Sequence, residues 1–286
     1  MQMPTMLEHI LGDELKEKLK EAMKSVPGDK THLQLKVEAY NNVEGDLGYV
    51  DCPKCKNKGL IAVINDQGEE VIRNCSCMKI RKLHRNLERS GLQGMYEQYN
   101  LENYGTTKRP WQKDVLLKAG NYVKAVASGE NYWLYVGGQT GSGKSHICVA
   151  AAGRLIALGK SVVFKLWQEI AADYRARTYR EDDRKELFHE LFECDVLYID
   201  DFLKVHDRNM IDYNYDLAFQ VLTGRYNARK PTIISTELLI NELAAEDSAL
   251  GGRINQMSGG GEYIINIEKI PENDMRRSTK GAEEHD

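Results

Sequence analysis

The sequence has no long hydrophobic run, which argues against a membrane-spanning helix. No apolar stretch approaches the roughly 20 residues that such a helix needs. The first residues, MQMPTMLEHILGDELKEKLKEA, contain several acids and lack the apolar core of a signal peptide. We therefore expect a cytoplasmic protein with no membrane partner.

An excess of positive charge is also absent. The chain has 39 basic and 43 acidic residues and a formal net charge of −4. It therefore has no overall attraction to nucleic acid, and any binding of DNA must depend on local basic patches. Internal repeats and low-complexity segments are lacking as well. A length of 286 residues suits one large domain and a smaller one.

Five short apolar runs, separated by helical patterns, occupy the C-terminal part of the chain. Each run has the length and composition of a buried parallel strand. The runs are 132–136, 162–166, 196–200, 232–236 and 263–267. Strands that alternate with helices in this way predict an α/β layered fold with a mostly parallel five-stranded sheet.

The composition changes along the chain and predicts five segments. The first is an N-terminal helical region, in which residues 6–24 carry the apolar stripe of an amphipathic helix. A cysteine module with a basic helix, a polar linker, the α/β domain and a flexible tail follow. The predicted boundaries of the five segments are 1–50, 51–90, 91–110, 111–277 and 278–286.

Four of the six cysteines surround a predicted hairpin. Cys52-x2-Cys55 and Cys75-x-Cys77 flank the segment LIAVINDQGEEVIR, whose two β-rich runs enclose an Asn-Asp-Gln-Gly turn. Four thiolates are the ligand set of a structural, tetrahedral zinc site, and such a site folds a module too small for a core of its own. We therefore predict that these cysteines bind Zn2+; unligated thiols are the alternative.

The stretch YVGGQTGSGKSH carries the most specific motif of the chain. Residues 138–145 fit G-x4-G-K-[ST], with an apolar strand before and a helix after, as this motif requires. The glycines let backbone N–H groups surround a phosphate at a helix N-terminus. We expect Lys144 to reach the β- and γ-phosphates of ATP and Ser145 to hold Mg2+. A merely flexible glycine loop is the alternative.

A pair of acids follows the apolar run of VLYIDDF. We expect Asp200 to bind Mg2+ and Asp201 to polarise the attacking water. Two adjacent acids favour hydrolysis over transfer of a phosphate to a small molecule. A buried strand that happens to end in two acids is the alternative. The predicted nucleotide-binding residues are Gly138, Gln139, Thr140, Gly141, Ser142, Gly143, Lys144, Ser145, His146 and Asp200.

Two further positions are catalytic candidates. The next apolar run, PTIISTE, ends in Ser235, Thr236 and Glu237, any of which can touch the γ-phosphate or its water. In ALGGRINQM we expect Arg253 to lie at a helix start and to reach a neighbouring copy's nucleotide, where it stabilises transition-state charge. The alternatives are an ordinary strand end and a surface salt-bridge arginine.

Two stretches are rich in basic residues. Residues 79–89 carry five Lys or Arg residues on a predicted helix, and DYRARTYR interleaves arginines with tyrosines. Charges that alternate with aromatic rings suit single-stranded DNA, because the charges contact phosphates and the rings stack under bases. A solvated helix face is the alternative for both stretches. The candidate DNA-binding residues are Tyr174, Arg175, Arg177, Tyr179 and Arg180.

From about residue 50 to 277 the chain resembles the DnaC/DnaI-type replicative helicase loaders of bacteria and phages, which are AAA+ ATPases. The resemblance rests on the combination and order of C-x2-C…C-x-C, ERSGL, YVGGQTGSGKSH, VLYIDDF, RYNARKPTIISTE and LGGRI. It implies that the N-terminal region and zinc module bind the hexameric DnaB-type helicase. It also implies that the ATPase domain binds ATP and single-stranded DNA and self-associates, so that Arg253 completes a neighbour's site.

The resemblance also implies roles for two further arginines, and the chain departs from the family pattern at two positions. Arg225 falls before the sensor strand, and Arg276 after the last strand, where it approaches the nucleotide. Many members have Asn in place of Glu237, whose carboxylate repels a γ-phosphate unless Mg2+ or an arginine compensates; Thr236 is the other sensor candidate. Asp201 stands where Glu is frequent, which predicts slow hydrolysis.

The expected function is therefore ATP-dependent loading of a replicative helicase onto single-stranded DNA. The alternative is an AAA+ helper of a DNA transposase, a class not expected to carry the cysteine module. A small-molecule kinase leaves that module and the basic helix unexplained.

Overall fold

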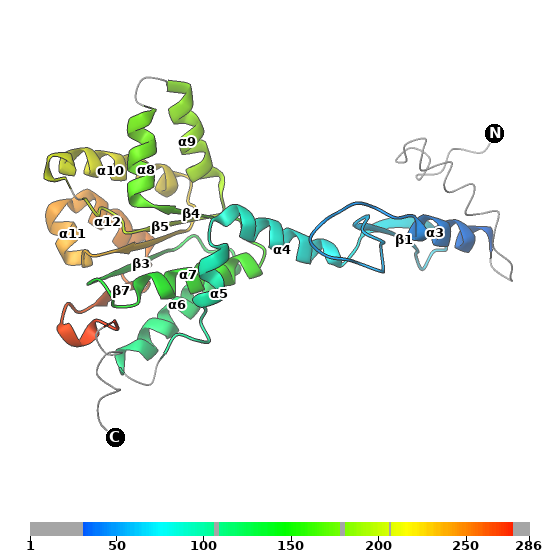
Figure 1. Cartoon of the computed structure of the whole chain (residues 1–286), viewed down its shortest axis with the longest axis horizontal. Coiled ribbons are helices and arrows are strands. Elements are labelled where there is room, and N and C mark those ends of the chain that lie inside the picture. Colours follow the sequence, from blue (N-terminus) through cyan, green and yellow to red (C-terminus); the bar gives the residue numbers. More distant parts are fainter. Residues whose placement is uncertain (1–30, 106–108, 178–180, 206, 277–286) are drawn as a thin grey trace. The chain divides into compact units, whose positions relative to one another are not determined.

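The computed structural model describes residues 31–105, 109–177, 181–205 and 207–276 (Figure 1). The helix expected at residues 6–24 and the tail expected at 278–286 lie outside these ranges. The chain divides into two compact units, Met1–His84 and Arg85–Asp286, which are described separately. Across the described ranges, no helix combines the length and the apolar surface needed to cross a membrane.

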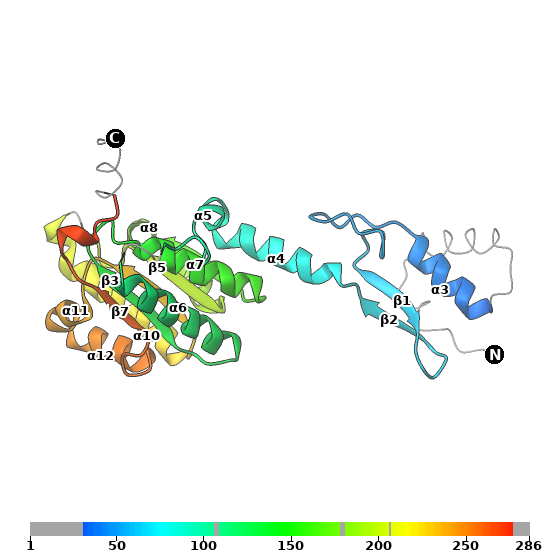
Figure 2. The same cartoon turned by 90° about the horizontal axis from the view of Figure 1, so that it is seen from below.

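In the first unit, helix α3 (His32–Asn42) packs on a hairpin of strands β1 (Leu60–Ile64) and β2 (Glu70–Asn74) (Figure 2). The strands pair antiparallel, so the predicted hairpin is confirmed. Asn41 fastens the helix to β1, because its side chain donates to the Ala62 carbonyl and accepts from the Ala62 N–H, both at 2.9 Å.

Helix α4 (Cys77–Ser90) follows β2 and contains the boundary between the two units. Its apolar residues recur at helical spacing, and a left-handed glycine, Gly91 with φ of 76°, ends it as predicted.

The second unit is an α/β domain built on a five-stranded parallel sheet. The strands are β3 (Trp133–Gly138), β4 (Val162–Leu166), β5 (Val196–Asp200), β6 (Thr232–Thr236) and β7 (Ile264–Ile267). They lie in the order β4-β5-β6-β3-β7, and every neighbouring pair is parallel. The five predicted strands and the predicted sheet are thus confirmed.

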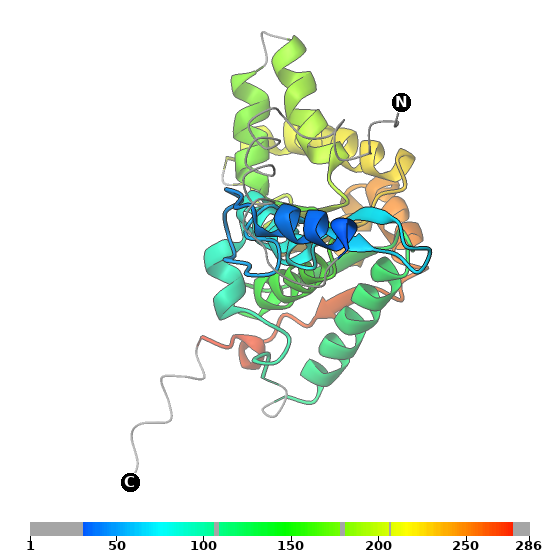
Figure 3. The same cartoon turned by 90° about the vertical axis from the view of Figure 1, so that its right-hand side faces the viewer.

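Helices cover both faces of this sheet. They are α5 (Gln93–Gln98), α6 (Trp111–Ala127), α7 (Lys144–Ala157), α8 (Trp167–Ala176), α9 (Glu181–Glu193), α10 (Ile211–Asn227), α11 (Ile240–Glu246) and α12 (Ser248–Met257), with short 3-10 turns at Arg208–Met210 and Pro271–Asn273. Helices α6 and α7 pack on one face, and α10 and α12 lie on the other (Figure 1). Helices α8 and α9 run side by side (Figure 3).

Strand β3 belongs to the core, since all of its residues are buried, as are those of β5 and β6. Trp133 and Tyr135 belong to the same buried cluster as residues of α8, α10 and α12. Because successive side chains of a strand point to opposite faces, Leu134 and Val136 face the side covered by α6 and α7. A strand buried on both faces fixes the position of the loop that follows it, and that loop is the predicted phosphate site.

Candidate nucleotide site and metal centre

The glycine loop joins the end of β3 to the first residue of α7, Lys144. Gly138, Gly141 and Gly143 have φ values of 154°, 80° and 84°, a region that side chains other than glycine rarely adopt. A Cβ on Gly141 would collide with the carboxylate of Asp274, and one on Gly143 would lie 2.7 Å from the Met275 side chain. The loop therefore needs glycine both for its turn and for its contact with the segment after β7.

Lys144 and Ser145 open helix α7 beside the end of β5. The Lys144 ammonium donates to the Gln139 carbonyl at 2.8 Å, and burial lowers its pKa against the opposing effect of nearby acids. The Ser145 hydroxyl lies 3.1 and 3.2 Å from the two carboxylate oxygens of Asp200. The Ser235 hydroxyl donates to the same carboxylate. A hydroxyl next to a buried carboxylate is the oxygen ligand set that Mg2+ prefers.

A cavity of about 350 Å3 opens over this loop. Its lining includes the predicted residues Thr140, Gly141, Gly143, Lys144, Ser145, His146, Asp201, Glu237 and Arg276. Three lining residues were not predicted: Tyr99, Lys204 and Met275. Of the other predicted nucleotide residues, Gly138, Gln139, Ser142 and Asp200 lie in or beside the loop but do not line the cavity.

Lys204 connects the two acids that face this cavity. Its ammonium lies 3.2 Å from an oxygen of Asp201 and 3.0 Å from an oxygen of Glu237. The Thr140 hydroxyl of the glycine loop donates to the same oxygen of Glu237 at 2.6 Å. The side chain that pairs with Glu237 is therefore a lysine three residues after Asp201, and not the arginine considered from the sequence.

The other sensor candidate points elsewhere. Thr236 is buried, and its hydroxyl donates to the Phe202 carbonyl at 2.7 Å and accepts from the Leu238 N–H at 3.2 Å. Its side chain thus shapes the turn after β6, whereas Glu237 faces the cavity.

The two arginines of the C-terminal half have different surroundings. Arg253 lies in the middle of α12 rather than at its start, with its guanidinium 4.2 Å from the centre of the Phe219 ring. It does not line the glycine-loop cavity of its own chain. Arg225 is fully buried and donates to the carbonyls of Cys194 at 2.9 Å and Asp195 at 3.2 Å. Arg225 is therefore a structural residue, whereas the role of Arg253 at a neighbouring copy stays a prediction.

The segment predicted as a polar linker packs on the phosphate loop. The His146 ring nitrogen lies 3.1 Å from the Asn100 carbonyl and 2.9 Å from the Asn103 side-chain oxygen, between the rings of Tyr99 and Tyr104. Burial lowers the pKa of His146. These contacts could not be predicted from the sequence, since the segment has no regular apolar period.

The DNA-binding candidates are only partly described. Tyr179 and Arg180 lie outside the described residues. The ring of Tyr174 packs against Phe188 of α9, and Arg177 pairs with Glu186 at 3.5 Å. Arg175 is exposed on α8. Tyr174 and Arg177 thus connect α8 with α9, and Arg175 is the candidate that faces solvent.

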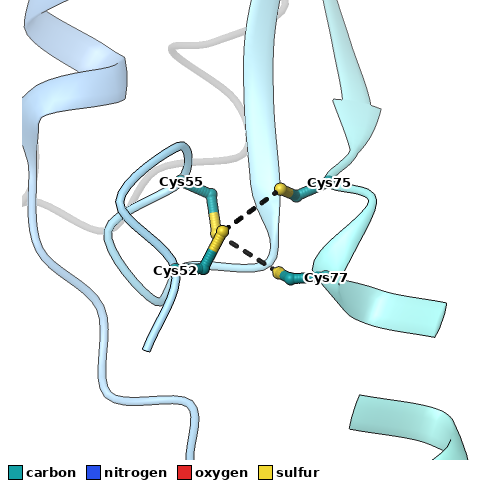
Figure 4. Close-up of side chains that lie close together, drawn as sticks. All are labelled: Cys52, Cys55, Cys75 and Cys77. Carbon is teal, nitrogen blue, oxygen red and sulfur yellow. Dashed lines mark hydrogen bonds between the residues drawn. The ribbon is translucent and has the colours of Figure 1, made fainter. Parts of the chain in front are cut away.

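The four clustered cysteines lie close enough to share one metal ion (Figure 4). Their sulfurs are all within 4.8 Å of one another, and all four residues are buried. The Gly59 N–H donates to the Cys55 sulfur at 3.3 Å. Backbone hydrogen bonds lower the pKa of Cys52 to about 7, and burial raises that of Cys77 to about 12. Four thiols without a disulfide, with an N–H directed at a sulfur, fit a tetrahedral thiolate site.

Arg81 shows that the basic helix is not simply a DNA-facing surface. Its side chain is buried and donates to the Val50 carbonyl at 2.6 Å and the Asn57 side chain at 2.8 Å. It also donates to the carbonyls of Leu47 and Gly48. Arg81 therefore holds the loop that carries the first cysteine pair.

The strand order, the glycine loop between β3 and α7, and the acids after β5 define an AAA+ P-loop NTPase domain. The chain is 30% identical over 231 residues to the phage-like element PBSX protein XkdC of Bacillus subtilis (strain 168), covering 78% of this chain and 85% of that protein. It is 26% identical over 175 residues to the replicative helicase loader DnaC of Escherichia coli (strain K12), covering 60% of this chain and 68% of that protein. The chain belongs to the DnaC/DnaI-type helicase loader family.

A solved structure described as a crystal structure of the DnaC helicase loader has a TM-score of 0.48 and 25% sequence identity to this chain. The matched region covers 62% of this chain and 99% of the solved chain. No family model matches the chain.

Proposed function

We propose that this protein is an ATP-dependent loader that places a DnaB-type hexameric helicase on single-stranded DNA. The observation that carries the proposal is the P-loop cavity with Lys144 at the helix start and Ser145 paired with Asp200, in a chain of the helicase loader family. Relatives named as helicase loaders favour this function over the transposase helper.

ATP is the substrate that this cavity suits. The backbone N–H groups at the start of α7 and the Lys144 ammonium are available to bind its phosphates. Lys144 then exchanges its hydrogen bond with the Gln139 carbonyl for one with phosphate. Ser145 and Asp200 would hold Mg2+, which would supply neutralisation of the phosphate charge. Asp201 accepts a proton from the attacking water.

Arg253 requires a second copy of the chain. Because it lies away from its own phosphate loop, its role in hydrolysis depends on self-association of the ATPase domain, which brings it to a neighbour's γ-phosphate. Arg276 lines the cavity of its own chain, so it can approach the nucleotide without a second copy.

The N-terminal region and the cysteine module are the proposed helicase-binding part, with residues 1–50 and 51–90 as its two segments. The four buried thiols fit Zn2+, which supplies a structural crosslink to a unit with a small hydrophobic core. Single-stranded DNA is assigned to the ATPase domain, with Arg175 as its most accessible candidate contact.

Light scattering after size exclusion tests the helicase contact directly. The protein is mixed with the replicative helicase of its host, with and without ATP. We expect a defined complex that is lost when residues 1–90 are deleted. No complex in either nucleotide state would contradict the proposal.

Phosphate release, with and without single-stranded DNA, tests the ATPase. We expect Lys144→Ala and Asp200→Asn to abolish it, while Lys124→Ala, an exposed change near the end of α6, leaves it intact. A Lys144→Ala protein that still loads helicase normally with ATP would overturn the mechanism.

A further inference from the structure

Lys204 is a second lysine in the nucleotide cavity, and no part of the P-loop motif requires it. It lies at the loop after β5, where Asp201 and Leu203 adopt left-handed φ values of 51° and 58°. This strained turn directs the side chain back over the cavity, where it touches both Asp201 and Glu237. The backbone thus holds a cation beside the two acids that face the glycine loop.

The charges explain why a cation is needed there. Asp201 and Glu237 both line the cavity into which a triphosphate fits, so two carboxylates would face the terminal phosphate. Burial acts to lower the pKa of Lys204, but its hydrogen bonds to Glu237 and Asp201 outweigh burial and raise it. The hydrogen bond from Thr140, opposed by burial and aided by Lys204, lowers the pKa of Glu237. Lys204 and Glu237 therefore both stay charged near neutral pH.

Lys204 can also change partners. Its side chain is 30% exposed, and the ammonium lies at the end of a flexible four-carbon chain, so a small rotation redirects it. Thr140 already donates to the Glu237 oxygen that Lys204 contacts, and a phosphate is another charged acceptor that the ammonium can bind. In a motif of this kind the loop would hold the diphosphate portion of a nucleotide and Lys144 would reach the β- and γ-phosphates, so the third phosphate would extend toward the acids.

We propose that Lys204 binds the terminal phosphate of a nucleoside triphosphate, and that Glu237 holds Lys204 ready in the diphosphate and empty states. The pair then distinguishes triphosphate from diphosphate, and the change of partner frees the Asp201 carboxylate for the water. This inference rests on the proposed function, because it requires ATP in the cavity.

The test is equilibrium binding of fluorescent ATP and ADP analogues to the full-length protein. We expect Lys204→Met to weaken ATP binding about 10-fold or more, the range for loss of a charge-assisted hydrogen bond, and to change ADP binding less than about 3-fold. Lys204→Arg keeps the charge and should restore most of the preference for ATP. Adding Glu237→Gln to Lys204→Met should recover part of the lost ATP affinity, because one repelling carboxylate is then neutral.

Lys124→Met is the matched control, since it removes an exposed lysine outside the cavity and should change neither affinity. Equal weakening of ATP and ADP binding by Lys204→Met, or no weakening, would overturn the inference while leaving the proposed ATPase intact. A wild-type protein that binds neither nucleotide would overturn the proposed function, and the inference with it. Circular dichroism of each variant verifies that it is folded.

Discussion

Replacing Arg225 by Met should destabilise the ATPase domain strongly without touching the nucleotide cavity. Arg225 is fully buried in α10, and its guanidinium joins the end of α9, the turn before β5 and the start of β6. Burial lowers its pKa, yet arginine remains charged. Met fills a similar volume but is neutral and offers no donor, so the substitution removes the charge and its hydrogen bonds with little change in packing.

The magnitude follows from the carbonyls that lose a donor. Arg225 donates to the Cys194 carbonyl at 2.9 Å, the Asp195 carbonyl at 3.2 Å and the Pro231 carbonyl. A buried acceptor left unsatisfied costs about 1–3 kcal/mol, and because neighbouring losses are not simply additive, losing the donor to these three carbonyls should cost roughly 3–5 kcal/mol. For a unit of this size, that loss lowers the melting temperature by roughly 6–20 °C.

Thermal unfolding followed by circular dichroism measures this effect. Arg175→Met, which removes an exposed arginine on α8, is the matched control and should leave the melting temperature unchanged. A loss below about 1 kcal/mol for Arg225→Met would refute the reasoning, since water would then be satisfying these carbonyls.

Three further changes test other contacts. Gly153→Ala should lower the free energy of unfolding by about 1–3 kcal/mol, because a Cβ there collides with the Tyr96 ring and displaces α5 from α7. The measurement is a thermal melt. Its control is Gly120→Ala, where a Cβ meets nothing within 4 Å, and this change should be neutral or stabilising. Cys55→Ser or a strong chelator should remove zinc, measured by elemental analysis, and unfold the first unit while ATP binding persists; retention of metal would contradict the four-thiolate assignment. Because the folded-state pKa of Glu237 is depressed, its stabilising contribution is present above its ordinary pKa near 4.5 and is lost as pH falls through the depressed value. The difference in melting temperature between wild type and Glu237→Gln should therefore shrink on acidification, and a constant difference would exclude this linkage.

The sheet could be predicted from the sequence because β3, β5 and β6 are buried on both faces and the edge strands β4 and β7 are also short apolar runs. Such strands appear as continuous apolar runs, and all five matched the structure to within two residues at each end. The P-loop could also be predicted from the sequence, because its backbone angles require glycine at fixed positions.

Long-range side-chain contacts could not be predicted in the same way. Lys204 and Glu237 are far apart in the sequence and meet because β5 and β6 are adjacent in the sheet. Arg81 and Arg225 look like surface arginines, and only the carbonyls that surround them show that both are buried. Composition indicates which residues carry charge, whereas the topology decides which charges face water.

The position of β3 in the sheet limits when the ATPase domain can fold during synthesis. Its two partners in the sheet are β6 and β7, which end at Thr236 and Ile267. During synthesis the glycine loop is therefore made well before the strands that fix it, and the domain must bring together segments that are distant in the chain. A nascent chain cannot form the complete glycine-loop cavity until β7 and the residues after it, which contact the loop, have left the ribosome.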